Sequence, residues 1–263
     1  MSAAPSSDPS PLPSSDPELS LVDEALRLAL CGDDMVLVEF LVVPEPGQGS
    51  ASASAPAANR SVRALMRQLA HDPLPFVMDQ VAGVTTLAVR LTEAAQRESS
   101  VQPFLSALHL RARQCLGVDA PKGKTVVLHA CFDAELAPDL AEVAQTLGRS
   151  PRQLIDAVLS TALEAEVVGF MPGFAYLRGL PADLAPPRRR APRPAVPAGS
   201  VAIAGGQAAV YPTATPGGWN LIGRCPDLLF APDREEPTLI GLGDRVQFRE
   251  ISRPEFEARW AQR

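Results

Sequence analysis

The pattern of apolar and polar positions divides the first half of the chain into short strands and two helices. Residues 21–30 fit helical spacing and also alternate loosely as a strand would, so a helix and a strand are both open for this segment. The pattern then predicts a strand over 35–43, a helix over 60–70 with Asn59 as its N-cap, and a hairpin of strands 76–81 and 85–91 around Gly83. A helix from a capping pair at Ser99 and Gln102 to about Leu116 and a strand over 124–129 are predicted to follow. This order of elements is typical of a compact α+β domain in which helices cover one sheet.

Residues 138–168 carry helical periodicity that one turn interrupts. The first helix ends at Gly148, and the second begins with a capping box that Ser150 opens. Two helices joined by a short turn with a glycine also resemble a DNA-binding helix-turn-helix unit. The second helix carries Arg152 but three carboxylates as well, which makes a poor surface for phosphates, so we favour a packing role over DNA binding. These carboxylates are Asp156, Glu164 and Glu166.

The chain changes character at about residue 169, where proline and glycine become frequent and apolar runs become short. Twelve of the chain's 27 prolines lie between Pro172 and Pro237. Short apolar runs separated by tight turns are typical of strands in a β-barrel or sandwich. The runs are 200–204, 208–211, 227–230, 237–242 and, after a Gly-Asp turn, 245–248; a terminal helix with Phe256 and Trp260 on its inner face is predicted over 254–263.

Composition marks two segments for which no regular structure is predicted. Residues 1–20 form a Ser/Pro/Asp-rich tail typical of disorder, and residues 44–58 form a low-complexity insertion between a strand and a helix. We therefore predict an N-terminal α+β domain over 21–130. A helical linker and a β-barrel domain are predicted to follow over 131–263.

Composition and charge narrow the class of protein. The chain has 263 residues, 46% of them hydrophobic, and a formal net charge of −6, which disfavours nucleic acid or an anionic membrane surface as a partner. The start of the chain lacks the pattern of a signal peptide, and no apolar run reaches the length of a membrane span, so we expect a cytoplasmic protein. The four cysteines and three histidines have neither CxxC nor HExxH spacing, so we expect reduced thiols and no zinc site.

The segment 169–223 gathers residue types that suit a binding site. The glycine pairs at 205–206 and 217–218 allow the backbone to approach a ligand closely, and tyrosine and tryptophan offer aromatic faces with polar edges. From residue types alone, a pocket for a small anionic or amide-bearing ligand and an ordinary loop with a solvated arginine run are both open. The arginines of this run are Arg188, Arg189, Arg190 and Arg193.

The order of residues in this segment is similar to that of a known family. The stretches GFMPGFAYLRGLP at 169–181, PRRRAPRPAVPAGSVAIAGGQAAVYP at 187–212 and PGGWNLIG at 216–223 resemble the family of KipI and the 5-oxoprolinase B subunit. This family is also called allophanate hydrolase subunit 1 or the carboxyltransferase C/D subdomain. The stretches GDDMVLVEF at 32–40 and GDRVQF at 243–248 extend the resemblance over most of the chain. It implies a small α/β sandwich domain followed by a cyclophilin-like β-barrel. It also implies that the ambiguous segment at 21–30 is the first strand, from about Ala25 to the Gly-Asp pair at 32–33.

The resemblance also implies membership of a complex that opens 5-oxo-L-proline to L-glutamate with hydrolysis of ATP. Its expected partners are a C-type protein of that complex, similar to allophanate hydrolase subunit 2, and an A-type protein. ATP with Mg²⁺ is the expected cofactor, bound here or on a partner, because the chain has no Walker A motif. Arg193 and Gln207 are the residues expected to be catalytic. Those expected to bind substrate or nucleotide are Gly173, Phe174, Tyr176, Arg188, Arg189, Gly205, Gly206, Tyr211, Pro216, Gly217, Gly218 and Trp219.

The sequence departs from the family pattern in two places. Many relatives carry a histidine and a tyrosine ahead of the GFxPGF loop, where this chain has Val158 and Leu163, which removes a candidate acid or base. The family's QTG is replaced by glutamine followed by Ala208 and Ala209. Two alternatives therefore stay open. One is a component of an allophanate or urea-type hydrolase, and the other is a non-catalytic KipI-like regulator that binds and inhibits a sensor histidine kinase.

Overall fold

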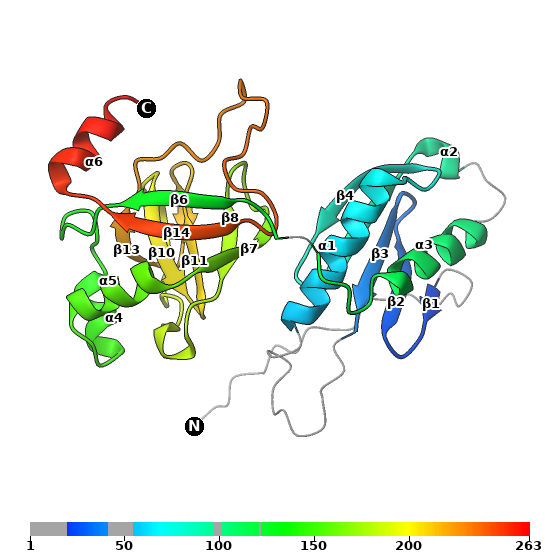
Figure 1. Cartoon of the computed structure of the whole chain (residues 1–263), viewed down its shortest axis with the longest axis horizontal. Helices are drawn as coiled ribbons and strands as arrows, with labels where there is room; N and C mark the ends of the chain where they lie inside the picture. The colour runs from blue at the N-terminus through cyan, green and yellow to red at the C-terminus, as the bar shows by residue number, and fades with distance from the viewer. Residues whose placement is uncertain (1–19, 42–54, 97–100, 121) are drawn as a thin grey trace. The chain divides into compact units, whose positions relative to one another are not determined.

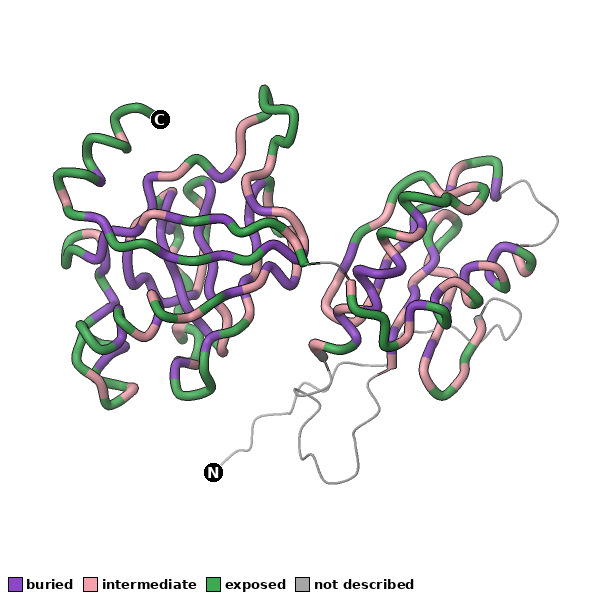
Figure 2. The backbone as a smooth tube through the Cα atoms, viewed as in Figure 1, coloured by how far each residue is buried: buried purple, intermediate pink, exposed green. Residues whose placement is uncertain are grey.

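The chain folds into two compact units, with the division between Asp119 and Ala120 (Figure 1). The computed structural model describes residues 20–41, 55–96, 101–120 and 122–263. Residues 1–19 of the predicted tail and residues 44–54 of the predicted insertion therefore lie outside the described residues. Figure 2 shows that each unit has its own buried interior.

The N-terminal unit is an antiparallel sheet covered by helices, as predicted (Figure 1). Its strand order is β1-β2-β3-β5-β4; helix α1 packs against β3, β4 and β5, and α3 packs against β1 and β2. Alternate residues of β3 are buried, which is the pattern of a strand with one covered face. The elements are β1 (Ser20–Val22), β2 (Leu26–Cys31), β3 (Met35–Phe40), α1 (Ala55–His71), β4 (Val77–Ala82), β5 (Thr86–Leu91), α2 (Glu93–Gln96) and α3 (Gln102–Gln114).

The first helix begins earlier than predicted. Because α1 starts at Ala55, Asn59 is not its N-cap but a buried residue inside it. The side-chain Nδ2 of Asn59 donates to the backbone oxygen of Val84 at 3.2 Å and so ties the helix to the β4–β5 turn. Within the described residues, α3 begins after Val101 without a side-chain cap, and the predicted cap Ser99 lies outside them.

The C-terminal unit is a barrel-like sheet of seven strands in the order β13-β10-β11-β8-β7-β14-β6. A bridge between Cys131 and Arg224 joins the ends of β6 and β13, so the two edge strands meet and the sheet nearly closes. The predicted α+β class with a C-terminal barrel is thus confirmed, whereas its likeness to cyclophilin stays a prediction. The strands are β6 (Thr125–Ala130), β7 (Leu163–Val168), β8 (Ala175–Arg178), β10 (Ser200–Ala204), β11 (Gln207–Val210), β13 (Asn220–Arg224) and β14 (Arg245–Glu250), with β9 (Arg193–Val196) and β12 (Thr215–Gly217) paired in a second sheet.

Three predictions for this half of the chain are wrong in detail. The strand predicted at 124–129 is present as β6, but it pairs with β14 in the barrel, so the boundary between the units lies near residue 120 rather than 130. Residues 163–168 form β7 instead of continuing a helix, because Leu163 and Ala165 are buried two positions apart, the period of a strand. The runs at 227–230 and 237–242 make an isolated bridge between Phe230 and Thr238 instead of strands.

The two predicted helices that precede β7 in the chain pack on the barrel. They are α4 (Leu140–Thr146), which contacts β13, and α5 (Pro151–Ser160), which contacts β14. Ser150 and Gln153 form the predicted capping box of α5. The guanidinium of Arg152 pairs with Asp156 and Glu250, which neutralises its charge and favours the packing role over DNA binding. The chain ends in the predicted helix, α6 (Arg253–Trp260), with Phe256 buried.

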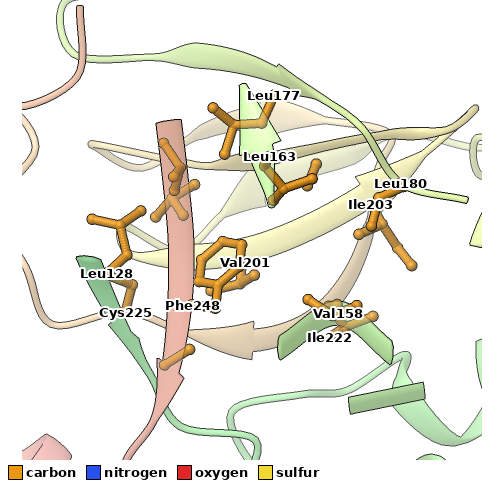
Figure 3. Close-up of a cluster of buried hydrophobic side chains, with 14 of the residues drawn as sticks. Leu128, Val158, Leu163, Leu177, Leu180, Val201, Ile203, Ile222, Cys225 and Phe248 are labelled. Carbon is orange, nitrogen blue, oxygen red and sulfur yellow. The ribbon is translucent and has the colours of Figure 1, made fainter. Parts of the chain in front are cut away.

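Strand β10 is buried on both faces, and this places an apolar layer outside the barrel core. Val201 and Ile203 lie in the core that Figure 3 shows, with other buried side chains of the barrel. Ala202 and Ala204, at the alternate positions, belong to a second cluster of buried residues. The strand thus separates the core from an outer apolar layer, on which the candidate site is built.

Candidate functional site

The outer apolar layer is an aromatic cluster centred on Phe174. The ring centroid of Phe174 lies 4.9 Å from that of Tyr176 and 5.3 Å from that of Tyr211. Trp219 closes the cluster, at 6.4 Å from Phe174 and 5.9 Å from Tyr176. All four contacts are edge-to-face, the arrangement that aromatic rings prefer. Three alanines of β10 and β11, whose small side chains leave space for the rings, complete the layer: Ala202, Ala204 and Ala209.

A cavity of about 340 Å³ lies against this cluster. A volume of this order suits a small molecule. One wall is aromatic, another is cationic, and a third consists of glycine and proline backbone. We call it the aromatic cavity; it is lined by Phe170, Phe174, Tyr176, Arg188, Arg189, Pro192, Tyr211, Pro216, Gly217, Gly218 and Trp219. The structure therefore brings together most of the residues predicted to bind substrate or nucleotide.

The cationic wall belongs to residues 186–192, which we call the Pro-Arg strap. Its prolines restrict the backbone, and hydrogen bonds to the barrel hold it in place. The backbone N–H of Gly205 donates to the oxygen of Pro186 at 2.8 Å, the Nδ2 of Asn220 donates to the oxygen of Pro187 at 2.9 Å, and the N–H of Arg189 donates to the oxygen of Gly218 at 2.8 Å. The strap thus fixes its arginines at the edge of the cavity.

Arg188 is the strap cation best placed to meet a ligand in the aromatic cavity. Its guanidinium carbon lies 5.8 Å from the ring centroid of Trp219, within the range of a cation–π contact. Across the described residues, no carboxylate pairs with Arg188. Its N–H donors are therefore open to a carboxylate or a phosphoryl group, which a guanidinium binds with two parallel hydrogen bonds.

Arg193, which the sequence predicts as catalytic, is committed to a buried ion pair. Its Nη2 lies 2.6 Å from Oδ1 of Asp139, and Nη1 of Arg189 lies 2.9 Å from the same oxygen. The other oxygen, Oδ2, accepts the backbone N–H of Leu221 at 2.7 Å. The side chain of Asp139 is 4% exposed, so these contacts are shielded from water. Among the described residues that line the cavity, Arg193 is not included, and its catalytic role stays a prediction.

The turn between β10 and β11 explains the first glycine pair. Ala204 pairs with Gln207, so Gly205 and Gly206 are the two central residues of a hairpin, with φ of 57° and 81°. A two-residue turn of this kind needs positive φ at both positions. The Nε2 of Gln207 donates to Oε2 of Glu166 at 3.2 Å. Since these turn residues lie outside the described lining of the cavity, their roles in catalysis and ligand binding stay predictions.

Two other predicted glycines are required by close packing. A Cβ at Gly217 would lie 2.6 Å from Oη of Tyr211 and 3.0 Å from Cγ2 of Val196. Gly173 has a φ of 80°, and a Cβ there would lie 2.8 Å from Cβ of Phe230. Gly217 therefore lets the cavity wall reach Tyr211, whereas Gly173 shapes the loop before Phe174 and stays outside the described lining.

The hydroxyl of Tyr211 remains neutral at physiological pH. Burial raises its pKa, and the neighbouring Tyr176 adds to the rise, whereas Arg188 and Arg193 oppose it. A neutral phenol can both donate and accept a hydrogen bond. Tyr211 therefore supplies the aromatic cavity with a polar group that carries no charge.

Three contributors to the site were not predicted. Phe170 is 62% exposed and lies 5.3 Å from Phe174, with a φ of 75° that is strained for a large side chain. Its position in the GFxPGF loop was a usable signal, but the motif does not tell which phenylalanine faces outward. Pro192 lies in the arginine run, where the charged residues give the stronger signal. Asp139 gave no local signal, because its partners follow far along the chain.

The departures from the family pattern are buried residues outside the described lining of the cavity, three of them in the barrel core and one in the aromatic cluster. Val158 and Leu163 are 0% and 1% exposed, and Figure 3 shows both among the buried side chains. Ala208 faces the same core, and Ala209 lies in the aromatic cluster. Within the described lining of the aromatic cavity none of these four residues is present. Their apolar character is therefore explained by packing.

The described residues offer neither a metal cluster nor an activated thiol. No group of three or more His, Cys, Asp or Glu side chains there is arranged to hold a metal ion. The four thiols are free, and burial raises the pKa of Cys115, Cys131 and Cys225, which makes these three poor nucleophiles. None of the helices in these ranges combines the length and apolar character that crossing a bilayer requires.

The barrel, the α+β unit that precedes it in the chain and the cavity lined by motif residues define the class of protein. Residues 26–240 match the family described as carboxyltransferase domain, subdomain C and D, and the chain belongs to this family. It is 44% identical over 135 residues to the 5-oxoprolinase B subunit of Bacillus subtilis (strain 168) and 45% identical over 175 residues to that of Escherichia coli O157:H7. The family expected from the motifs is therefore confirmed.

These matches cover only part of each relative. The first spans 51% of this chain and 56% of the Bacillus protein, and the second spans 66% of this chain and 78% of the Escherichia protein. The match to the crystal structure of TTHA0988 covers 82% of this chain and 40% of the TTHA0988 chain, with a TM-score of 0.65 and 31% identity. The K. lactis urea amidolyase matches 92% of this chain and 16% of its own, with a TM-score of 0.64 and 17% identity, and supports the fold alone.

Proposed function

We propose that this chain is a subunit of an ATP-dependent complex that opens 5-oxo-L-proline to L-glutamate. The observation that carries the proposal is the aromatic cavity, in which a cluster of rings faces Arg188 of the Pro-Arg strap. The relatives named as B subunits of 5-oxoprolinase support this choice of substrate. 5-Oxoproline has a nearly flat lactam ring, which suits an aromatic wall, and a carboxylate, which suits a guanidinium.

The chemistry of the substrate explains why ATP is needed. A five-membered lactam is a stable amide, and phosphorylation of its carbonyl oxygen by the γ-phosphoryl group of ATP, with departure of ADP, activates the ring carbon. One water then adds to that carbon, and the C–N bond breaks as the nitrogen takes up a proton, which leaves the γ-acyl phosphate of glutamate. A second water hydrolyses this acyl phosphate to the carboxylate and releases phosphate. Guanidinium groups stabilise the charge on a transferring phosphoryl group. Arg188 and Arg189 are the cavity residues that supply this charge.

The composition of the cavity lining explains why partner proteins are needed. Its ionisable side chains, within the described residues, are two tyrosines and two arginines, and none is a carboxylate or histidine. Ring opening requires a general base for water and an acid for the leaving nitrogen. We assign these groups to a C-type or A-type partner. The Mg²⁺ that accompanies ATP is likewise assigned to the nucleotide or to a partner, since the described residues build no metal cluster.

The experiment that tests this proposal is a reconstitution. The full chain is combined with its A-type and C-type partner proteins, and ATP-dependent release of glutamate from 5-oxoproline is measured while each component is omitted in turn. We expect glutamate from the full set and none when this chain is left out. An assembled complex that hydrolyses no 5-oxoproline would contradict the proposal; it would favour a urea-type substrate or a KipI-like regulator that binds a sensor kinase.

A further inference from the structure

Arginines of the Pro-Arg strap also line a second cavity, of about 410 Å³. We call it the strap cavity. It is bounded by the strap itself, by helix α4 and by Asn220 of β13. Arg188, Arg189 and Arg190 all line it, whereas its lining contains a single carboxylate, that of Glu142. Three guanidiniums against one carboxylate, in a chain whose formal net charge is −6, make this a local concentration of positive charge.

Two of the three guanidiniums have no carboxylate partner in the part of the chain that the structure describes. Arg188 and Arg190 are exposed, and no carboxylate among the described residues pairs with either of them. Only Arg189 has such a partner, through the contact of its Nη1 with Asp139. Like charges held close together without counter-charges repel one another and are stabilised by a bound anion. The strap cavity therefore has the electrostatic character of an anion site.

The two cavities share part of their walls. Arg188 and Arg189 line both the aromatic cavity and the strap cavity, whereas Arg190 lines only the strap cavity. Hydrogen bonds from Gly205 and Asn220 hold the backbone of the strap, so the backbone that carries the shared arginines is fixed in position. Ligands in the two cavities would therefore meet at the same pair of guanidiniums.

We propose that the strap cavity binds the phosphate chain of a nucleoside triphosphate, beside an amide substrate in the aromatic cavity. This inference rests on the proposed function, which requires a phosphoryl donor next to the lactam oxygen. Guanidiniums bind phosphate oxygens with paired hydrogen bonds, and an arginine shared between donor and acceptor lies where charge develops during transfer. The volume of about 410 Å³ is within the range of small-molecule sites.

Binding measurements on the full chain test this directly. The probe is the non-hydrolysable ATP analogue AMP-PNP, titrated calorimetrically into the wild type and the variants Arg190→Gln and Arg249→Gln. Arg249 is an exposed arginine of β14 outside both described linings, so its variant matches the change in charge. We expect Arg190→Gln to weaken AMP-PNP binding about tenfold, since a charge-assisted hydrogen bond is lost, and Arg249→Gln to leave it unchanged.

Adenosine and 5-oxoproline serve as further probes. Adenosine lacks phosphates and should bind at least about tenfold more weakly than AMP-PNP, and 5-oxoproline should bind the Arg190→Gln variant as tightly as the wild type. Absence of AMP-PNP binding, equal binding by Arg190→Gln, or equal binding of adenosine would overturn the proposal. If glutamate is produced but Arg190→Gln binds AMP-PNP as tightly as the wild type, only the assignment of the strap cavity is refuted. Binding of AMP-PNP that depends on Arg190 without any glutamate production would refute the proposed function alone.

Discussion

Oδ1 of Asp139 lies 2.6 Å from Nη2 of Arg193, and this buried contact joins the start of α4 to strand β9. The same carboxylate also holds Arg189, a residue that lines both cavities. The pair thus sets the position of the Pro-Arg strap relative to the barrel. The contact with Asp139 gives Arg193 a structural part in this motif, while its catalytic role stays a prediction.

Replacement of the Asp139 carboxylate should destabilise the barrel unit. Asp139→Asn leaves two guanidiniums without their counter-charge, and we expect the free energy of unfolding to fall by about 2–3 kcal/mol. Asp183→Asn is the matched control, because Asp183 is 63% exposed and pairs with Arg149 at the surface. It should change stability by less than about 1 kcal/mol. Urea denaturation measures both variants, and equal losses would show that the Asp139 network is no stronger than a surface pair.

The neighbouring glycines 217 and 218 should respond differently to alanine. The new Cβ in Gly217→Ala lies 2.6 Å from Oη of Tyr211, so the wall must shift, whereas in Gly218→Ala the nearest atoms lie at 3.8–3.9 Å. We expect Gly217→Ala to lower stability by about 1–3 kcal/mol and the affinity for 5-oxoproline by about tenfold. Gly218→Ala should bind normally. A normal affinity in both variants would remove Gly217 and Tyr211 from the ligand site.

The glycine pair of the β10–β11 hairpin should matter for stability but not for activity. Gly205 has a φ of 57° and its absent Cβ would have open space around it, so Gly205→Ala introduces only backbone strain. We expect a loss of about 1–2 kcal/mol in unfolding free energy. The kcat/KM for 5-oxoproline in the reconstituted complex should stay as in the wild type. A large fall in kcat/KM at unchanged stability would instead place this turn at the ligand.

The raised pKa of Tyr211 predicts a loss of stability at alkaline pH. The folded protein keeps this proton above pH 10, the ordinary pKa of tyrosine, whereas the unfolded chain releases it. The contribution is therefore complete below about pH 10 and is lost as the pH rises through the raised pKa of the folded state. The chain has two tyrosines, so the difference between the tyrosinate absorbance of wild type and Tyr211→Phe isolates this group. A midpoint at or below pH 10 would contradict its burial.

Local signals predicted the elements of this fold better than its long-range pairings. The capping box at Ser150 and the β4–β5 hairpin around Gly83 each lie within a few residues, and both are present. The membership of β6 in the barrel depends on its pairing with β14, which is separated by most of the domain. The pattern of a single strand does not encode which distant strand it joins.

The candidate site was predicted as a set of residue types but not as a geometry. The aromatic residues and Arg188 that the motif indicated line one cavity, and their role in binding stays a prediction. It did not separate these from Arg193 and Gln207, because their partners Asp139 and Glu166 lie in other elements. The Gly205–Gly206 pair between two apolar runs is itself a hairpin signal, and this local interpretation accounts for it without a ligand.

The most direct test of the aromatic cavity as the substrate site is the steady-state kinetics of Arg188→Gln in the reconstituted complex. Arg249→Gln provides the same change in charge on an exposed position of β14. We predict that Arg188→Gln lowers kcat/KM for ATP-dependent glutamate formation about 10- to 100-fold, because a charge-assisted contact to the substrate is lost, and that Arg249→Gln does not. Equal kcat/KM values for the two variants would contradict the central claim.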